Sequence, residues 1–526
     1  MSTWTSIEVS GMKGTRVLRT CARAALLALA LVGLAATAAT AAVRLPAVIG
    51  ENMVLQCDRP VPLWGWATPG RQVTVAIGER KAAAAANDRG EWLVRLEPMA
   101  ASAEPQVLTV TDEDGAKVVC GNVLIGEVWL GSGQSNMEMA LQGSEGGKEF
   151  AQAADLPAIR LLIVPRAVSG TPRTDVQAQW KVCSPATVPG FSAVLYEFGR
   201  NLHQELKVPV GLIASSWGGT RIEPWTPPEG FAAVPALKNE HDWLAQANAA
   251  YEREKAAAID KAAKWLDAAR AAAAEGRAIP EPPPWPQHAV SGNQQPTALY
   301  NGMIRPLAPF AIRGAIWYQG EANVGAGMRY FDLMKGLIQG WRQVWGEGDF
   351  PFYYVQIAPY RYGADAQALP RLWEAQTATL ALPNTGMAVT VDIATVGDIH
   401  PPNKHEVGRR LALWALARDY GRKDLVYSGP LYDKHEIDGR NVTIQFTHAD
   451  GGLVSRDGKP LTWFTVAGED KTFLPANAEI VGDAVVVTCP EIEHPAAVRF
   501  GWNHIAEPNL ANEAGLPASP FRTDKW

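Results

Sequence analysis

The chain has 526 residues, of which 47% are hydrophobic and 19% charged, and its formal net charge is -6. This length favours two or three domains over a single core, and the composition is that of a globular protein. No basic patch of the kind that binds nucleic acid stands out, so nucleic acid is not expected as a partner.

The N-terminus has the pattern of an export signal. Basic residues precede an apolar run at 24–35, and a stretch of alanines and threonines follows and ends at Ala42. This order predicts a signal peptide over residues 1–42 and a periplasmic or secreted protein. The alternative is a membrane anchor, but the apolar run is short for a spanning helix. We therefore expect no stable membrane anchor after cleavage.

Four cysteines follow that segment: Cys57, Cys120, Cys183 and Cys489. They are widely separated and form no Cys-x-x-Cys pair, so neither a zinc site nor a redox site is expected. An exported protein can form disulfides, and the sequence leaves open whether these thiols pair or stay free and buried.

Residues 43–119 carry the signals of short strands and turns. Apolar and β-branched runs occur at 61–67, 73–77 and 107–111, and turn sequences such as Asp88-Arg-Gly separate them. Short strands separated by such turns predict a small β-sandwich.

Strand-like and helical patterns alternate between residues 120 and 425. The strand-like runs are 123–125, 159–164, 210–214, 314–318, 352–357 and 387–391. The helical patterns between them include 193–206, 330–344 and 404–420. This alternation predicts a parallel sheet with helices on both faces. The carboxyl ends of such strands meet at one edge of the sheet, where ligands bind.

Residues 229–295 interrupt the alternation. A helical stretch rich in Ala, Glu and Lys at 243–274 is followed by a proline-rich arm at 280–286. One interpretation is a solvated insertion without chemistry. The other is a lid beside the active site, or a contact with a second subunit of a homo-oligomer.

Strand signals return in residues 426–526. Apolar runs at 442–446, 461–466 and 484–488 are separated by turn sequences. They predict a second β region. One hypothesis is that it pairs with the first, so that both ends of the chain build one accessory domain.

Four polar loops follow apolar strands of the α/β region. In the first, Ser135 lies in Gly131-Ser-Gly-Gln-Ser-Asn-Met, where a tight turn exposes the hydroxyl and leaves backbone amides free. In the second, the paired glycines Gly218 and Gly219 let a backbone amide approach an oxyanion closely. Either loop alone is more often a plain turn.

The third and fourth loops add an amide and an imidazole. Asn323 of the third can donate a hydrogen bond to a tetrahedral oxyanion. His400 of the fourth precedes a helix, with Asp398 and Asp392 upstream. A lone histidine is usually structural, but one beside Asp at a strand end is placed to act as an oriented base.

Ser, Gly, Asn and His in this order resemble the SGNH hydrolase superfamily. Within it, the motifs look like those of the sialate O-acetylesterase family and its bacterial carbohydrate acetylesterase relatives, over nearly the whole mature chain. The motifs are Gly133-Gln-Ser-Asn-Met, Trp217-Gly-Gly-Thr, Tyr300-Asn-Gly-Met-Ile, Trp317-Tyr-Gln-Gly-Glu-Ala-Asn and Asp398-Ile-His-Pro. The resemblance implies a three-layer α/β/α sandwich that hydrolyses carbohydrate O-acetyl esters, with no metal and no organic cofactor.

The resemblance also implies roles for the four loop residues. Ser135 is the nucleophile and His400 its general base. The oxyanion donors are the Ser135 amide, an amide of Gly218 or Gly219, and the Asn323 side chain.

The acid that orients the histidine is less certain from the motif. Many superfamily members have Asp three residues before the histidine, whereas here Asp398 lies two before His400. Asp398 is the first choice and Asp392 the alternative. A backbone carbonyl can also orient the ring, which would leave a dyad.

Polar residues of the same loops suit a substrate rich in hydroxyl groups. The expected contacts to an acetylated saccharide are Gln134, Arg221, Trp225, Gln319 and Glu321. A lipase or thioesterase on this fold would need an apolar trough by the serine instead. A non-catalytic carbohydrate-binding protein on a decayed hydrolase core is the other alternative, and it would not turn over p-nitrophenyl acetate.

The sequence leaves the sugar open. Arg221 could bind the carboxylate of sialic acid, or it could pair with Glu223. Trp217, Trp225 and Trp317 could stack on a neutral plant polysaccharide such as acetylated xylan or xyloglucan.

Overall fold

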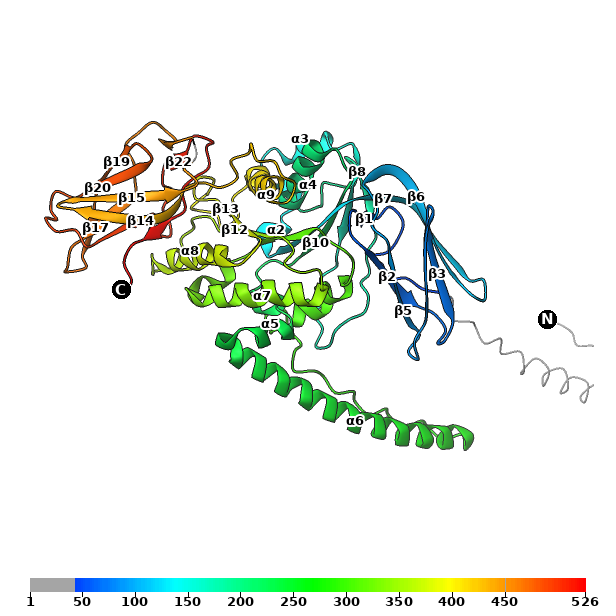
Figure 1. Ribbon diagram of the computed structural model, residues 1–526. Helices are drawn as coiled ribbons and strands as arrows, with labels where there is room; N and C mark the ends of the chain where they lie inside the picture. The colour runs from blue at the N-terminus through cyan, green and yellow to red at the C-terminus, as the bar shows by residue number, and fades with distance from the viewer. Residues whose placement is uncertain (1–42, 450) are drawn as a thin grey trace, which may run out of the picture.

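The computed structural model describes residues 43–449 and 451–526, so the expected signal peptide lies outside the described residues. An α/β body occupies the middle of an elongated molecule, with a group of β-strands at each end (Figure 1). Within the described ranges, no helix combines the length and the hydropathy needed to cross a membrane.

The centre of the body is a sheet with the strand order β13-β12-β11-β7-β10-β8-β9. Its strands are β7 (Lys117–Gly133), β8 (Leu156–Ile163), β9 (Lys181–Cys183), β10 (Val210–Ser216), β11 (Gly314–Tyr318), β12 (Phe352–Gln356) and β13 (Thr385–Val389). All neighbouring pairs are parallel except β8 and β9. Every residue of β10, β11 and β12 is buried, as expected for strands covered on both faces.

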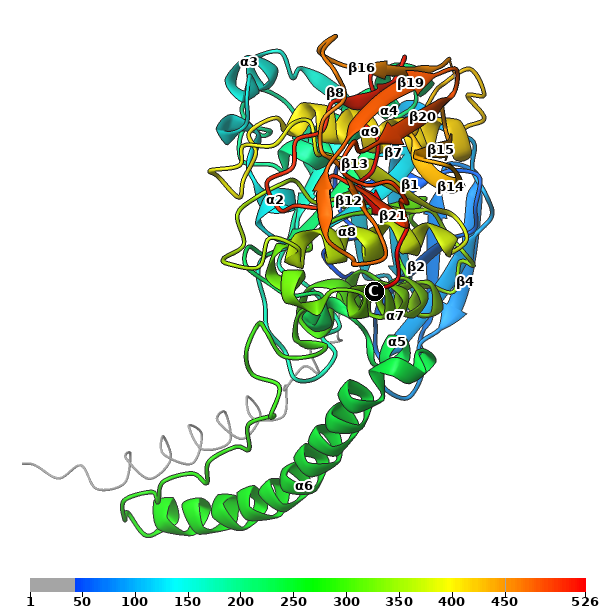
Figure 2. The same cartoon turned by 90° about the vertical axis from the view of Figure 1, so that its left-hand side faces the viewer.

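Helices cover both faces of this sheet (Figures 1 and 2). The helices of the body are α2 (Ser135–Glu138), α3 (Gly147–Gln152), α4 (Ala193–Leu206), α7 (Arg329–Trp345), α8 (Ala368–Ala378) and α9 (Lys404–Arg418). On one face α4 packs against α9, and on the other α7 packs against α8. The expected α/β/α sandwich with a parallel sheet is therefore confirmed.

The N-terminal strands lie at one end of the body. They are β1 (Val54–Gln56), β2 (Val61–Trp66), β3 (Gln72–Ile77), β4 (Arg80–Ala85), β5 (Glu91–Leu96) and β6 (Ser102–Asp112). β6 pairs with the first part of β7, and the second part of β7 enters the central sheet. The domain boundary expected after residue 119 falls inside this single strand.

The C-terminal β region lies at the opposite end of the molecule (Figure 1). Its strands are β14 (Leu431–Asp438), β15 (Asn441–Thr447), β16 (Leu453–Ser455), β17 (Phe464–Ala467), β18 (Phe473–Pro475), β19 (Asn477–Val481), β20 (Ala484–Thr488), β21 (Ala497–Phe500), β22 (Leu510–Asn512) and β23 (Phe521–Arg522). They enclose an apolar cluster of their own. The hypothesis that the two β regions pair is wrong, because the α/β body separates them.

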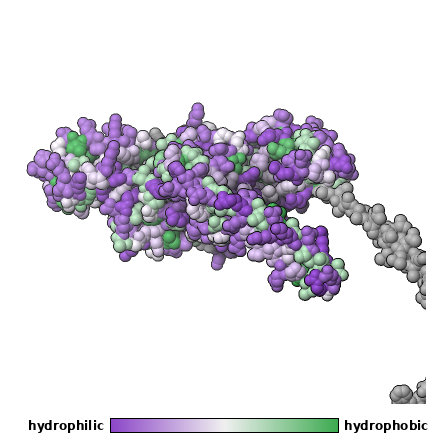
Figure 3. Space-filling view, turned by 90° about the horizontal axis from the view of Figure 1, so that it is seen from below, coloured by the Kyte–Doolittle hydropathy of each residue, from purple (hydrophilic) through white to green (hydrophobic). Residues whose placement is uncertain are grey.

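The insertion begins on the body and then projects from it (Figures 1 and 2). α5 (Pro228–Ala233) packs so closely on α7 that a Cβ on Gly230 would lie 2.1 Å from a carbonyl oxygen of that helix. α6 (Lys238–Ala274) then leaves the body. The returning arm follows it, and the Nε1 of Trp265 donates to the Pro280 carbonyl at 2.8 Å. Seen from below, the projecting part mixes hydrophilic and hydrophobic residues (Figure 3).

The cysteines carry no cross-link in the part of the chain that the structure describes. Cys57, Cys120, Cys183 and Cys489 are all buried and free. Of the two possibilities left open by the sequence, the structure therefore has buried thiols. No group of three or more His, Cys, Asp or Glu side chains within residues 43–449 and 451–526 is arranged to hold a metal ion.

Candidate active site

Ser135 and His400 are in hydrogen-bond contact at the carboxyl edge of the sheet. Ser135 is the first residue of α2 and comes almost directly after β7. His400 lies in the loop between β13 and α9, and its Nε2 is 2.8 Å from the Ser135 Oγ. At this distance an imidazole can take the proton of the hydroxyl. The structure thus brings together two residues that are 265 positions apart in the chain.

Gly133 makes the turn before the nucleophile possible. Its φ is +139°, and a Cβ at this position would lie 2.1 Å from the carbonyl oxygen of Tyr318 in β11. Glycine is the residue that tolerates both this conformation and this approach. The nucleophile loop therefore lies directly against the loop that follows β11 and carries Asn323.

Asp398 lies beside His400 without a hydrogen bond to the ring. Its Oδ1 accepts the backbone N–H of His400 at 2.9 Å and is 3.7 Å from the ring Nδ1. The second distance exceeds that of a hydrogen bond. The Asp398 side chain is also 59% exposed. The structure therefore holds a Ser135–His400 dyad with an acid close enough to interact electrostatically.

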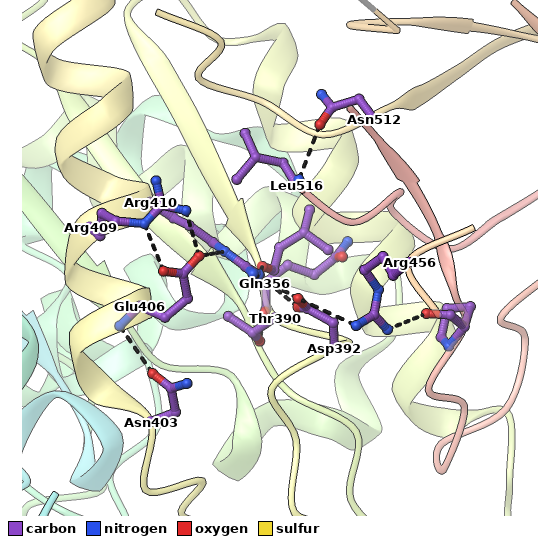
Figure 4. Close-up of polar contacts among 12 residues, drawn as sticks. Gln356, Thr390, Asp392, Asn403, Glu406, Arg409, Arg410, Arg456, Asn512 and Leu516 are labelled. Atoms are coloured by element: carbon purple, nitrogen blue, oxygen red, sulfur yellow. Dashed lines mark hydrogen bonds and ion pairs between the residues drawn. The ribbon is translucent and has the colours of Figure 1, made fainter. Parts of the chain in front are cut away.

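Asp392 instead binds a buried arginine of α9 (Figure 4). Each of its carboxylate oxygens lies 2.7 Å from a nitrogen of Arg410. Arg456 of the C-terminal region approaches the same carboxylate to 3.9 Å. Asp392 thus joins the end of β13 to α9, and Asp398 is the acid that the structure places at His400.

The two candidate glycine amides differ in their partners. The amide of Gly218 donates to the Oε2 of Glu138 at 2.8 Å. Gly218 also lies against the nucleophile, because a Cβ on it would be 3.2 Å from the Ser135 Cβ. Gly219 has a φ of +72°, a left-handed conformation that favours glycine. Since Glu138 occupies the Gly218 amide, Gly219 is the better candidate for the oxyanion donor.

Asn323 is held in one orientation by its neighbours. Its Oδ1 accepts hydrogen bonds from the Ile222 amide at 3.0 Å and from the Gln319 Nε2 at 2.8 Å. Its Nδ2 donates to Glu223 at 3.1 Å. The two donors identify the oxygen of the side-chain amide, so the nitrogen and its two N–H groups point the other way. Glu223 accepts one of these N–H groups, and the other is left for an oxyanion.

Most of the residues expected to touch the sugar are buried in the protein instead. Trp225 and Gln319 are completely buried, and Gln134 and Glu321 nearly so. The Trp225 Nε1 donates to Thr220, and the Gln134 side chain accepts from the Ala322 amide. The expectation of direct sugar contact is wrong for these side chains, because they are buried and bonded within the protein, Trp225 within its own loop and Gln134 to the loop after β11. Trp317 is likewise buried and offers no stacking face.

The rim of the site has arginines that are already paired. Arg221 lies 2.6 Å from Glu223 and is half exposed. Arg166 donates to Glu138 at 2.7 Å, and its guanidinium lies 5.5 Å from the ring centroid of Trp217. Trp217 is half-buried, so it is the tryptophan of the three expected here that keeps an accessible surface.

Asn136 connects the loop of the nucleophile to the loop of the histidine. Its Nδ2 donates to the Ile399 carbonyl at 3.0 Å and also to the Glu321 carboxylate. Its Oδ1 accepts from the Nζ of Lys404. Burial lowers the pKa of Lys404 to about 7, although the charge of Glu321 opposes this shift. Burial also raises the pKa of the Glu321 carboxyl.

The end of the insertion also contacts the site. The Nε2 of Gln294 donates to the Gly219 carbonyl at 3.0 Å, and its Oε1 accepts the Arg221 amide at 3.3 Å. Sequence reasoning missed Gln294, Glu138, Asn136 and Lys404. The sequence does point to Asn136 and Lys404, since Asn136 directly follows the nucleophile and Lys404 directly follows the loop of the histidine. It does not point to Gln294, because the partners of Gln294 are about 75 residues away.

Comparisons with known proteins identify relatives among carbohydrate esterases. A family model described as "Carbohydrate esterase, sialic acid-specific acetylesterase" matches residues 274–417. The chain is 30% identical to a sialate O-acetylesterase of Rattus norvegicus, over 87% of this chain and 89% of that protein. It is 28% identical to the sialate O-acetylesterase of Homo sapiens, over 91% and 92% of the two chains. The solved structure of XAC1771, a carbohydrate acetylesterase from Xanthomonas citri, is 35% identical, covers 92% of this chain and 100% of that chain, and has a TM-score of 0.78.

Proposed function

Because this chain belongs to the sialate O-acetylesterase family of carbohydrate esterases and hydrolyses carbohydrate O-acetyl esters, we propose that Ser135 and His400 perform this reaction. The observation that carries the assignment is the contact of 2.8 Å between His400 Nε2 and Ser135 Oγ. An intact pair of this kind does not favour the alternative of a decayed, non-catalytic core. The remaining steps follow from the positions of the neighbouring groups.

The first half of the reaction acetylates the serine. His400 takes the proton of the Ser135 hydroxyl as Oγ attacks the acetyl carbonyl carbon. The bond between that carbon and the sugar oxygen then breaks, and the sugar oxygen leaves with the proton from His400. In the second half, His400 takes a proton from water, and the hydroxide attacks the acetyl-serine. Acetate leaves and Ser135 regains its proton.

The negative oxygen of each tetrahedral intermediate needs hydrogen-bond donors. The Ser135 amide lies in the first turn of α2 and has no acceptor within that helix. The Gly219 amide and the remaining N–H of Asn323 complete the set. A single such donor is worth about 3 kcal/mol of transition-state stabilisation in a comparable hydrolase.

A serine substitution tests the nucleophile, and the preceding strand offers a matched control. Ser135→Ala should reduce kcat by about 10⁴-fold or more with the fold intact. Ser132→Ala should leave kcat within about twofold, because Ser132 is fully buried in β7 and lies outside the chemistry. Activity of the Ser135 variant above about a tenth of wild type would reject the assignment.

The substrate class follows from the charges at the rim. Arg221 pairs with Glu223 and Arg166 with Glu138, so a glutamate already neutralises each cation that a sialic acid carboxylate could approach. A neutral sugar needs no unpaired cation and can use the accessible surface of Trp217. The proposed substrate is therefore a neutral acetylated saccharide derived from a plant polysaccharide.

Acetate release from three substrates tests this choice. Acetylated xylan and acetylated xyloglucan should each give a kcat/KM at least about tenfold above that of 9-O-acetyl sialic acid. The reverse ranking would show that the paired arginines still bind the sialic acid carboxylate, and it would reject the neutral substrate. Release from none of the three, with p-nitrophenyl acetate still hydrolysed, would place the substrate outside these sugars.

Export is part of the same proposal, because acetylated plant polysaccharide lies outside the cell. The basic, apolar and small-residue segments over residues 1–42 support it. N-terminal sequencing of the protein recovered from periplasm or medium should give a start near Val43. A protein recovered only from cytoplasm with its N-terminus intact would contradict export.

A further inference from the structure

A cleft of about 740 Å³ separates the antiparallel pair of strands β2 and β5 from the α/β body. On the side of the strand pair it is lined by Trp64, Trp66 and Leu93, and on the body side by Arg173, Tyr300 and Pro309. We call it the β2–β5 cleft. Its volume falls within the range of about 300–1,000 Å³ that is typical of sites for small molecules.

The β2–β5 cleft lies at the edge of the sheet opposite to the nucleophile. Pro309 precedes the start of β11, and Val344, another lining residue, precedes the start of β12. Ser135 and Asn323 instead come after the carboxyl ends of β7 and β11. Since these strands are parallel, the two groups of residues occupy opposite edges. A ligand in the cleft is therefore remote from the ester that is cleaved.

The β2–β5 strand pair presents an aromatic face to this cleft. Trp64 and Trp66 are two positions apart on β2, so their side chains lie on the same side of the strand. Their partners across the pair are Leu93 and Glu91 of β5, which share that side. Leu93 is 40% exposed, and both tryptophans are only half-buried. Trp64 packs in part against the core and the Arg44 guanidinium lies 3.8 Å from the ring centroid of Trp66, so each indole offers part of its surface to a ligand.

Polar groups surround the aromatic face. Glu91 accepts hydrogen bonds from Arg89 at 2.7 Å and from Asn87 at 3.1 Å, and all three line the cleft.

We propose that the β2–β5 cleft is a second saccharide-binding site, which holds units of a polysaccharide chain that are remote from the acetyl group. Flat indole surfaces match the apolar faces of sugar rings, and the surrounding polar groups match sugar hydroxyls. Binding there tethers the polymer to the enzyme and so lowers KM for a polymer without changing the chemistry at Ser135. The inference rests on the proposed function, because it takes the substrate to be a neutral polysaccharide.

Binding without hydrolysis tests the site. In a Ser135→Ala background, calorimetry with deacetylated xylan and with deacetylated xyloglucan should detect binding to at least one of them. Trp64→Ala together with Trp66→Ala should weaken that binding by at least about tenfold, since aromatic anchors carry most of the energy of such contacts. Trp463→Ala is the matched control, because Trp463 is 37% exposed but belongs to the C-terminal region. Leu93→Arg fills the cleft with the indoles intact and should weaken binding as well.

Kinetics separate this inference from the proposed function. In the active enzyme, the double substitution of Trp64 and Trp66 by Ala should raise KM for acetylated xylan or xyloglucan by about fivefold or more. It should leave p-nitrophenyl acetate hydrolysis unchanged. No binding to either deacetylated polymer, or equal binding by the cleft variants and their parent, would overturn the site even if acetate release is normal. Failure of acetate release with intact binding would instead overturn the proposed substrate.

Discussion

The side-chain amide of Asn136 donates a hydrogen bond of 3.0 Å to the carbonyl oxygen of Ile399. Asn136 directly follows the nucleophile and Ile399 directly precedes His400, so one bond joins the two loops that must stay in register for proton transfer. Asn136 is almost completely buried, which shields this bond from water. Its geometry makes Asn136 a positioning residue for the Ser135–His400 pair.

Asn136→Ala should therefore lower kcat and leave KM almost unchanged. A loss of about 10²-fold is expected, because misplacement of the reacting groups by about 1 Å has this effect. Steady-state kinetics with p-nitrophenyl acetate would measure it. Asn201→Ala on α4 removes a comparable side-chain bond to a carbonyl and should keep full activity. A rise in KM with normal kcat would contradict the positioning role.

Asp398 and Asp392 should differ in what their substitution damages. Asp398→Asn should reduce kcat by about tenfold, well short of the 10⁴-fold loss measured where a buried acid bonds the imidazole, because Asp398 is exposed and 3.7 Å from the Nδ1. Asp392→Asn should lower the free energy of unfolding by about 3 kcal/mol, since it removes the carboxylate that bonds the buried Arg410 through both oxygens and leaves Glu406 as its remaining charged partner.

Kinetics and urea unfolding of the two Asp variants would distinguish the roles. A 10⁴-fold loss in Asp398→Asn would show that Asp398 bonds the ring during turnover and completes a triad. A large loss of kcat in Asp392→Asn with unchanged stability would return Asp392 to the catalytic site.

The arrangement of the site was readable from the sequence because it depends on topology. Parallel strands bring their carboxyl ends to one edge, so loops that follow β7, β10, β11 and β13 had to meet. That alone placed Ser135 near His400 and Asn323. The direction of each side chain within those loops does not follow from topology.

Trp225 and Gln319 show where sequence reasoning fails. Gln319 precedes Gly320, yet its side chain turns inward and donates to the Thr220 carbonyl of the loop after β10. Trp225 follows the paired glycines of that loop, yet it is buried edge-on against Trp317 of β11. The choice between Gly218 and Gly219 likewise depended on Glu138, whose contact joins segments 80 positions apart. Contacts of this range are set by packing of the whole fold and leave no local pattern.

Lys404 should make stability depend on pH. Its pKa is 10.5 in the unfolded chain and about 7 in the folded protein, chiefly because of burial. Between these values the unfolded state holds the extra proton, so the free energy of unfolding gains up to about 1.4 kcal/mol per pH unit as pH rises. Below pH 7 both states are protonated and the folded protein bears the cost of the buried charge.

Lys404→Met removes this titration. Urea unfolding at several pH values between about 7.5 and 9.5 should show a slope for wild type that is steeper than that of the variant by about 1.4 kcal/mol per unit. Lys148→Met replaces an exposed lysine and should keep the wild-type slope. Equal slopes for wild type and Lys404→Met would mean that Lys404 stays charged when buried, held by Glu321.

The insertion should matter for catalysis through the residues where it joins the body, which we call its root, and not through its far end, which we call its tip. Residues near the root are tied together, since His288 contacts Asn248 at 2.9 Å, and Gln294 holds the Gly219 loop. The tip leads away from the body (Figures 1 and 2). Replacing residues 254–286 with a short Gly/Ser linker keeps α5 and these root contacts.

This replacement should therefore leave kcat/KM within about twofold for both p-nitrophenyl acetate and an acetylated oligosaccharide. Gln294→Ala should lower kcat about tenfold for both, because it loosens the loop that supplies the Gly219 amide. Light scattering of the wild-type and the shortened protein would show whether the tip also joins subunits. If the shortened protein loses activity on the oligosaccharide alone, the tip governs access of the substrate to the site. An unchanged molecular mass of the shortened protein would then indicate a lid, and a halved mass would indicate that the tip acts from a second subunit.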